Sequence, residues 1–269
     1  MKYLKAFESH SEDEIHFICD ELSINQYTIN PDGSVDIYDD VDLNNMGLRK
    51  LPLKFRRVHG IFDCSYNELT TLDGSPSYVE DFDCSHNKLT TLEGSPSKVI
   101  LSFDCSSNEL TGLESGPIEV GGNYWCSHNR LINLKGAPLE ISGDFNCGNN
   151  ELANLKGAPI RVDGDFDCLN NKLISLEGAP KKVGQDFDCQ NNELMDLKGG
   201  PSEIGGNFLC IQNPIWAIWR LFPNHKSFLD SLDYGYLRGD KINKRRFQEA
   251  LEEVGIEIPR YIRGWKYID

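Results

Sequence analysis

The sequence predicts a solenoid, in which copies of one short unit stack and each unit adds a strand to a parallel sheet. The motif Cys-x-x-Asn occurs eight times, with a first step of 20 residues and later steps of 21. A constant period of this size is the signature of stacked structural units. Within each unit, apolar and polar residues alternate over four positions, which is the period of a short strand. The motifs begin at Cys64, Cys84, Cys105, Cys126, Cys147, Cys168, Cys189 and Cys210.

The unit at residues 79–96 shows the order of its elements. Its key positions fit L-x-x-L-x-L-x-x-N-x-L, the leucine-rich-repeat pattern; they are Val79, Phe82, Cys84, Asn87 and Leu89. Alternation places Phe82 and Cys84 inside, while Gly94 and Pro96 start an extended return. We therefore expect a leucine-rich-repeat solenoid with parallel strands on its concave face. Turns and extended or 3₁₀ segments should form the convex face.

The cysteines and asparagines of the motif are expected to be structural. Eight of the nine cysteines share one position in the unit, and Cys19 lies outside the repeats. Buried reduced thiols that act as small apolar groups are the favoured interpretation; a metal ladder is the alternative, although the sequence has no Cys-x-x-Cys pair. Each asparagine amide should satisfy backbone groups where the chain turns inside the solenoid.

The segments that flank the solenoid, residues 58–213, are expected to cap its ends, because end coils would otherwise expose core. In the N-terminal cap, residues 1–57, Ser11 and Glu14 form a capping-box pattern that predicts a helix over residues 11–22. The turn from Asn30 to Gly33 predicts a hairpin between 27–29 and 35–37. The C-terminal cap, residues 214–269, should be helical, with one short helix near Phe228 and another over 243–254.

The charge distribution restricts the class of partner. The net charge is −15; residues 214–269 hold 10 Lys/Arg and 8 Asp/Glu (+2), so residues 1–213 hold 17 and 34 (−17). An acidic solenoid disfavours nucleic acid as its ligand and suits a basic protein partner. The basic residues of the C-terminal cap form either a solvated helix face or a phosphate contact; they are Lys241, Lys244, Arg245 and Arg246.

Neither membrane insertion nor catalysis is indicated. The sequence has no apolar run of about 18 residues, and its first residues lack the apolar stretch of a secretory signal, so we expect a cytoplasmic protein. It contains six histidines but no His-x-x-x-His pair, phosphate-binding glycine loop or nucleophile elbow. A cysteine-dependent ubiquitin ligase domain after the repeats would need a cysteine in that segment, and no cysteine follows Cys210. We expect no enzyme activity, cofactor or catalytic metal.

The outward strand positions form the candidate site. The trailing row follows the core aromatic of each unit and the leading row precedes it. The trailing row comprises Asp63, Asp83, Asp104, Trp125, Asn146, Asp167, Asp188 and Leu209; the leading row comprises Ile61, Asp81, Ser102, Asn123, Asp144, Asp165, Asp186 and Asn207. Stacked carboxylates repel by about 1 kcal/mol per close pair in water, so we expect the fold to gain nothing from them.

Three interpretations of these rows remain open. The aspartates could merely keep the strands soluble, or a cluster such as Asp165, Asp167, Asp186 and Asp188 could hold a divalent cation. Alternatively, a basic protein docks there with Trp125 as its aromatic anchor. In this last interpretation, the contact residues are Asp83, Asp104, Trp125, Asp144, Asn146, Asp165, Asp167, Asp186 and Asp188.

The repeat form F-[DN]-C-x-x-N-x-L-x-x-L-x-G-[AS]-P resembles the short leucine-rich repeats of proteins encoded by tailed bacteriophages. The flanking segments that share this resemblance are Met1–Glu8, 27–34, 51–55, 213–216, 221–222 and 263–266. The resemblance implies a binding protein in the host cytoplasm that blocks a basic host factor, such as a defence nuclease or another nucleic-acid-binding protein. The alternative is a structural or assembly role in a phage particle or complex, exerted through the caps.

Overall fold

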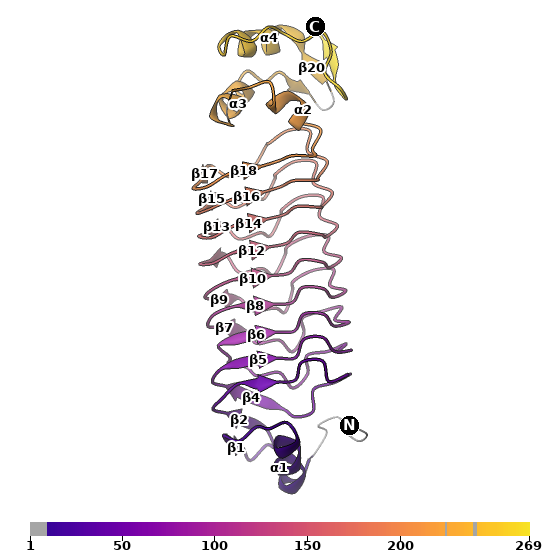
Figure 1. The fold of residues 1–269 in the computed structure, drawn as a ribbon, viewed down its shortest axis with the longest axis vertical. Helices are drawn as coiled ribbons and strands as arrows, with labels where there is room; N and C mark the ends of the chain where they lie inside the picture. Colours follow the sequence, from indigo (N-terminus) through magenta and orange to yellow (C-terminus); the bar gives the residue numbers. More distant parts are fainter. Residues whose placement is uncertain (1–9, 224, 239–240) are drawn as a thin grey trace.

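The computed structural model describes residues 10–223, 225–238 and 241–269, so Met1–Glu8 lies outside the described residues. The chain forms an elongated stack of coils, with α1 (Glu12–Glu21) at one end and α2 (Trp216–Trp219), α3 (His225–Leu232) and α4 (Lys244–Glu252) at the other (Figure 1). Each coil from residue 41 to residue 210 contributes one strand to a common sheet. The predicted solenoid of parallel strands is therefore confirmed.

This principal sheet has nine strands in the order β18-β16-β14-β12-β10-β8-β6-β5-β3. All neighbours are parallel and in register, so that Phe145 lies opposite Phe166 and Asn146 opposite Asp167. The strands are β3 (Val41–Asp42), β5 (Ile61–Asp63), β6 (Asp81–Asp83), β8 (Phe103–Asp104), β10 (Tyr124–Trp125), β12 (Phe145–Asn146), β14 (Phe166–Asp167), β16 (Phe187–Asp188) and β18 (Phe208–Leu209). β3 precedes residue 58, so the sheet begins inside the segment expected to be the N-terminal cap.

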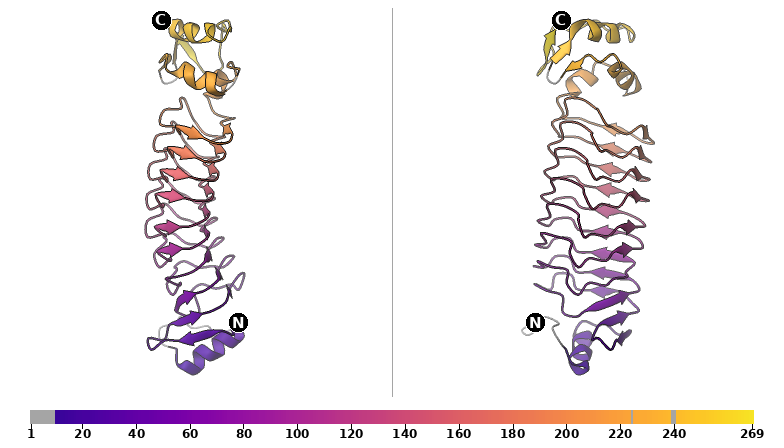
Figure 2. Two further views of the ribbon diagram at one scale, coloured as in Figure 1. Left: turned by 90° about the vertical axis from the view of Figure 1, so that its left-hand side faces the viewer. Right: turned by 180° about the vertical axis from the view of Figure 1, so that it is seen from behind.

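A second series of strands runs along the extended return of each coil, where the sequence led us to expect only turns and extended or 3₁₀ segments. β7 pairs with β9, and β11, β13, β15 and β17 form a four-stranded parallel sheet (Figure 2). These strands are β7 (Lys98–Val99), β9 (Glu119–Val120), β11 (Glu140–Ile141), β13 (Arg161–Val162), β15 (Lys182–Val183) and β17 (Glu203–Ile204). In each, the first residue is exposed and the second points into the core or its margin.

The core is a set of stacked columns rather than a single cluster. One aromatic ring per coil packs on the next, with ring centroids 5.1 to 5.7 Å apart from Phe62 to Phe208. All nine cysteines are free and buried. Burial raises the pKa of the thiols from Cys64 to Cys189 well above its usual value. They therefore pack as small apolar groups, as expected, and are not available as thiolate nucleophiles.

The motif asparagines satisfy backbone groups as predicted. Asn150 is typical: its Nδ2 donates to the carbonyl oxygens of Cys126 and Cys147 at 3.1 Å, and its Oδ1 accepts from the Leu131 N–H at 2.9 Å. One side chain thereby joins two coils at the point where the strand ends. The residue before each asparagine adopts a positive φ, for example 56° at Asn149, which turns the chain out of the sheet.

The N-terminal end has the predicted local structure. Ser11 and Glu14 form the capping box of α1, which buries Ile15, Ile18 and Cys19. β1 (Tyr27–Ile29) and β2 (Val35–Ile37) form the expected antiparallel hairpin. β2 then pairs in parallel with β4 (Phe55–Val58), which connects the hairpin to the first coils.

The C-terminal end differs from the helical segment that we expected. Besides its three helices, it contains a three-stranded sheet of β19 (Leu237–Arg238), β20 (Lys241–Asn243) and β21 (Lys266–Ile268). Because these strands are two or three residues long, they carry little periodic signal. Trp219 packs on the last ring of the core column, Phe208, with centroids 5.4 Å apart. Of the basic cluster, Lys241 lies in β20, and the other three residues lie on α4.

Candidate functional site

The structure brings the predicted contact residues together on one face of the principal sheet. In the trailing row, Trp125 lies opposite Asp104 on one side and Asn146 on the other, and Asp167 lies opposite Asp188. The leading row runs alongside, one residue before each core aromatic. All nine predicted contact side chains are half-buried. Their position as a single surface is therefore established, whereas their role as partner contacts stays a prediction.

The trailing row caps the ends of most strands, Trp125 and Leu209 being the exceptions. In six of the coils, the side-chain Oδ1 accepts a hydrogen bond from the backbone N–H two residues later, at 2.8 to 2.9 Å. Asp167, for example, accepts from Leu169 N–H at 2.9 Å. This local turn satisfies a backbone donor that the sheet cannot pair. The fold therefore gains a backbone cap from these side chains, a role that the sequence analysis missed, whereas the prediction that it gains nothing from stacking their charges is not contradicted by the caps.

The polar members of the leading row cap the starts of strands, and they do so between coils. Asp144 Oδ1 accepts from the backbone N–H of Asp165, and Asp165 Oδ1 accepts from that of Asp186, both at 2.8 Å. Asp81 and Asn123 make the same bond to the next coil. Each bond joins residues 21 positions apart. This relation becomes visible only when the coils are in register.

Capping explains the type of side chain but not its charge. Asn146 caps Gly148 with the geometry that Asp167 shows, and Asn123 caps Asp144 as Asp144 caps Asp165. An amide oxygen is thus sufficient at both row positions. The negative charge at the other positions has no structural function that these bonds account for.

One charged column elsewhere on the solenoid has a different order of signs. The position after the motif asparagine alternates in sign from coil to coil, so that neighbours form ion pairs at 3.0 to 3.5 Å. This column is Glu68, Lys88, Glu109, Arg130, Glu151, Lys172 and Glu193. Neighbouring charges of alternating sign attract and stabilise the stack, whereas neighbouring like charges repel and destabilise it. The acid rows lack this arrangement and place carboxylates next to carboxylates.

The electrostatic cost of the rows appears in the pKa values of their carboxyl groups. Burial raises the pKa of Asp83 and of Asp104 above the usual range. For Asp167, burial and the nearby Asp188 and Asp165 outweigh the Leu169 N–H bond and raise the pKa to about 6. Asp186, at the more open end, has a lowered pKa because the backbone and side chain of Asn207 donate to it.

No metal centre accompanies the rows in the part of the chain that the structure describes. Over residues 10–223, 225–238 and 241–269, no group of three or more His, Cys, Asp or Glu side chains is placed to hold a metal ion. This includes Asp165, Asp167, Asp186 and Asp188. Among these residues, too, no helix combines the length and apolar character that a membrane crossing requires.

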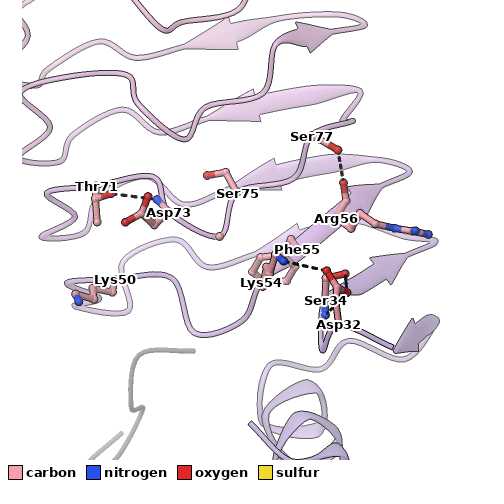
Figure 3. Close-up of a pocket in the computed structure, with 11 residues that line it drawn as sticks. Asp32, Ser34, Lys50, Lys54, Phe55, Arg56, Thr71, Asp73, Ser75 and Ser77 are labelled. Atoms are coloured by element: carbon pink, nitrogen blue, oxygen red, sulfur yellow. Dashed lines mark hydrogen bonds and ion pairs between the residues drawn. The ribbon is translucent and has the colours of Figure 1, made fainter. Parts of the chain in front are cut away.

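A depression of about 640 Å³ lies between the β1–β2 turn and the first coils (Figure 3), and sequence analysis did not indicate it. Lys54 and Arg56 line it, together with Asp32. Lys54 forms an ion pair with Asp32 at 2.9 Å, and Arg56 pairs with Asp36. Lys54 and Arg56 are thus each paired with a carboxylate of the protein, and Lys50 is the third cation in the lining.

The fold and its acid rows define a parallel β-solenoid built from Cys-x-x-Asn coils with an acidic sheet face. Among solved structures, the chain is similar to YopM from Yersinia pestis, described as a leucine-rich effector protein, at 20% identity and a TM-score of 0.38. It is also similar to YopM from Yersinia enterocolitica WA-314, at 15% identity and a TM-score of 0.31. The match covers 65% of this chain in both cases, and 60% and 64% of the two YopM chains.

No protein-family model matches the chain, and no curated protein matches it either. The parallel, in-register strands of the chain itself form the solenoid.

Proposed function

We propose that this protein is a non-enzymatic protein-interaction module whose acid rows bind a basic protein partner, with Trp125 as the aromatic anchor near the middle of the rows. One observation carries the proposal: asparagine performs the cap at two row positions, yet aspartate occupies most of the others. Charge that the fold does not require, and that burial makes costly, is best explained by a cationic ligand.

A basic partner would relieve the electrostatic cost of the rows. Lys or Arg side chains placed near Asp83, Asp104 and Asp167 would lower the raised pKa values of these carboxyls and favour their ionised form. The excess of negative charge in residues 1–213 would also accelerate the encounter. The half-buried indole of Trp125 would supply apolar contact between the charged positions, as tryptophan does at energetic hot spots.

The resemblance to phage-encoded repeat proteins extends this proposal to a biological setting. In that setting the protein acts in the host cytoplasm and blocks a basic host factor. A row of carboxylates can occupy a groove that otherwise holds the phosphates of nucleic acid, so defence nucleases and other nucleic-acid-binding proteins are the proposed targets. A role in particle assembly through the ends of the solenoid would not depend on the rows.

The test compares the wild type with a variant in which Asp83, Asp104, Asp167 and Asp188 are all replaced by Asn. The caps survive, because the amide oxygen remains, and only the charge is lost. In a pull-down from bacterial lysate, the wild type should retain a basic protein at low salt and release it at high salt. The tetra-Asn variant should retain none while remaining folded by circular dichroism. Equal retention by both proteins would refute the proposal.

A matched control replaces a carboxylate outside the rows. Glu193→Gln removes one charge from the alternating column and should leave capture unchanged. Trp125→Ala should weaken capture without altering its salt dependence, because it removes apolar contact and no charge. Co-purification of all these variants with phage particles would instead favour the assembly role.

A further inference from the structure

A second surface of the solenoid carries an unpaired apolar column. Ile118, Leu139 and Ile160 occupy the same position in three successive coils, two residues before the buried Val or Ile of the second strand. Their side chains are exposed by 70%, 70% and 50%. They line one shallow depression together with residues 98–100, 119–121 and Glu140. Three stacked, exposed aliphatic side chains form the kind of patch that marks an interaction site.

The adjacent column is charged, and its order is unusual. The first residues of the six second strands are Lys98, Glu119, Glu140, Arg161, Lys182 and Glu203. All six are exposed, and successive members lie opposite one another in the parallel pairs β7–β9, β11–β13, β13–β15 and β15–β17. Along the solenoid, the signs therefore run plus, minus, minus, plus, plus, minus. At about 4.8 Å per coil, this column is roughly 24 Å long.

We propose that this surface binds a second copy of the same chain, in antiparallel orientation, about a two-fold axis between β11 and β13. A two-fold axis reverses the column, and the reversed order is complementary to the original at every position. Glu140 then faces Arg161 of the second copy, Glu119 faces Lys182, and Lys98 faces Glu203. By symmetry, each contact occurs twice, as in any two-fold interface.

No other register makes all six positions complementary: an axis between β7 and β9, or between β15 and β17, matches only one pair of residues. With the axis between β9 and β11, Glu119 faces Glu140 and Lys98 faces Arg161, so like charges oppose each other. With the axis between β13 and β15, Arg161 faces Lys182 and Glu140 faces Glu203. A two-fold axis parallel to the solenoid places every residue opposite itself. Like charges in direct opposition disfavour a complex, so the central axis is the arrangement in which the whole column is complementary.

The apolar column agrees with the same axis. Leu139 faces Ile160 of the second copy, which places these two aliphatic residues at the centre. Next outward, Ile118 faces Lys181, whose aliphatic stem can cover it while the ammonium group stays in water. The arrangement has an apolar centre and a charged rim, as stable protein interfaces do.

Ion pairs within the chain prepare the rim for this contact. Lys98 already pairs with Glu119 at 2.6 Å, and Lys182 with Glu203 at 3.3 Å. In the antiparallel dimer, the Lys98–Glu119 pair of one copy lies against the Lys182–Glu203 pair of the other. Four charges of alternating sign therefore meet at each end of the interface. The principal sheet, which carries the acid rows, is a separate hydrogen-bonded sheet of the solenoid (Figure 2).

The test uses charge reversal at the centre of the proposed interface, with sedimentation velocity of the full chain as the measurement. The wild type should sediment as a dimer. Glu140→Arg places arginine opposite Arg161 at two symmetric positions, and Arg161→Glu places glutamate opposite Glu140. Each single variant should raise the dimer dissociation constant by roughly tenfold or more. An equimolar mixture of the two variants should regain the dimer, because each reversed residue then faces an opposite charge.

The mixture separates loss of the interface from loss of the fold, since misfolded variants would not rescue one another. Glu193→Arg, a matched reversal outside this surface, should leave the dimer intact. Leu139→Ser should weaken the dimer without changing the circular dichroism spectrum. The proposal is overturned if the wild type is monomeric at all concentrations, if both single variants remain dimeric, or if the mixture stays monomeric.

Discussion

Replacing Asp167 by Asn should stabilise the protein at neutral pH. The substitution retains the oxygen that accepts the Leu169 N–H bond and removes a carboxylate whose pKa is raised from 3.8 to about 6. Two pKa units at about 1.4 kcal/mol each set an upper bound of about 3 kcal/mol. Since the side chain is partly exposed, solvent screening reduces the expected gain to about 1–2 kcal/mol at pH 7.

The gain should depend on pH with a defined sign. The pKa of Asp167 in the folded state lies above its unfolded value, so the folded state holds more protons between about pH 4 and 6. The wild-type side chain therefore destabilises the fold increasingly as the pH rises through this window. At pH 4 the carboxyl is protonated and uncharged, and the difference in unfolding free energy between Asp167→Asn and the wild type should nearly vanish.

Urea denaturation followed by tryptophan fluorescence at pH 4 and pH 7 measures the gain in unfolding free energy and its dependence on pH. Asp167→Ala is the matched control, because it removes the charge and the acceptor together. It should be less stable than Asp167→Asn by about 1 kcal/mol at both pH values, the usual worth of one hydrogen bond. The reasoning is refuted if Asp167→Asn is less stable than the wild type at pH 7, or if its advantage is the same at both pH values.

Four further outcomes are expected. Tyr124→Phe should raise the unfolding free energy by about 1–3 kcal/mol, because the Tyr124 hydroxyl is buried without a partner in the aromatic column; a loss of thermal stability would contradict this. Asn150→Ala should lower it by about 1–3 kcal/mol through unpaired backbone groups, as measured by denaturation. Gly157→Ala should cost at least about 1 kcal/mol, because its φ is 91° and a Cβ would lie 2.5 Å from Lys135 N; an unchanged melting temperature would argue against it. Capture of a basic ligand should weaken as the pH falls below about 6, where Asp167 takes up its proton, and a binding titration at pH 5 and 7 measures this.

Several features of the fold could be predicted because their signals are local or periodic. The spacing of the cysteines specifies the length of a coil, and the alternation around Phe82 specifies which side chains enter the core. Ser11 and Glu14 mark the start of α1 through hydrogen bonds within one turn. Asn30 to Gly33 mark the hairpin. In each case, the interacting groups are a few residues apart, or the same pattern recurs in every unit.

Other features depend on which coil lies against which, and they required the tertiary structure. The bond from Asp165 N–H to Asp144 Oδ1 joins residues 21 positions apart, so the capping role of the leading row has no signal within one unit. The second strands are two residues long, and they exist only because adjacent coils bring their backbones within hydrogen-bonding distance. The charge order from Lys98 to Glu203 likewise becomes a surface only in register. Composition and period thus determine the coil, whereas the contacts between coils decide what its faces present to a partner.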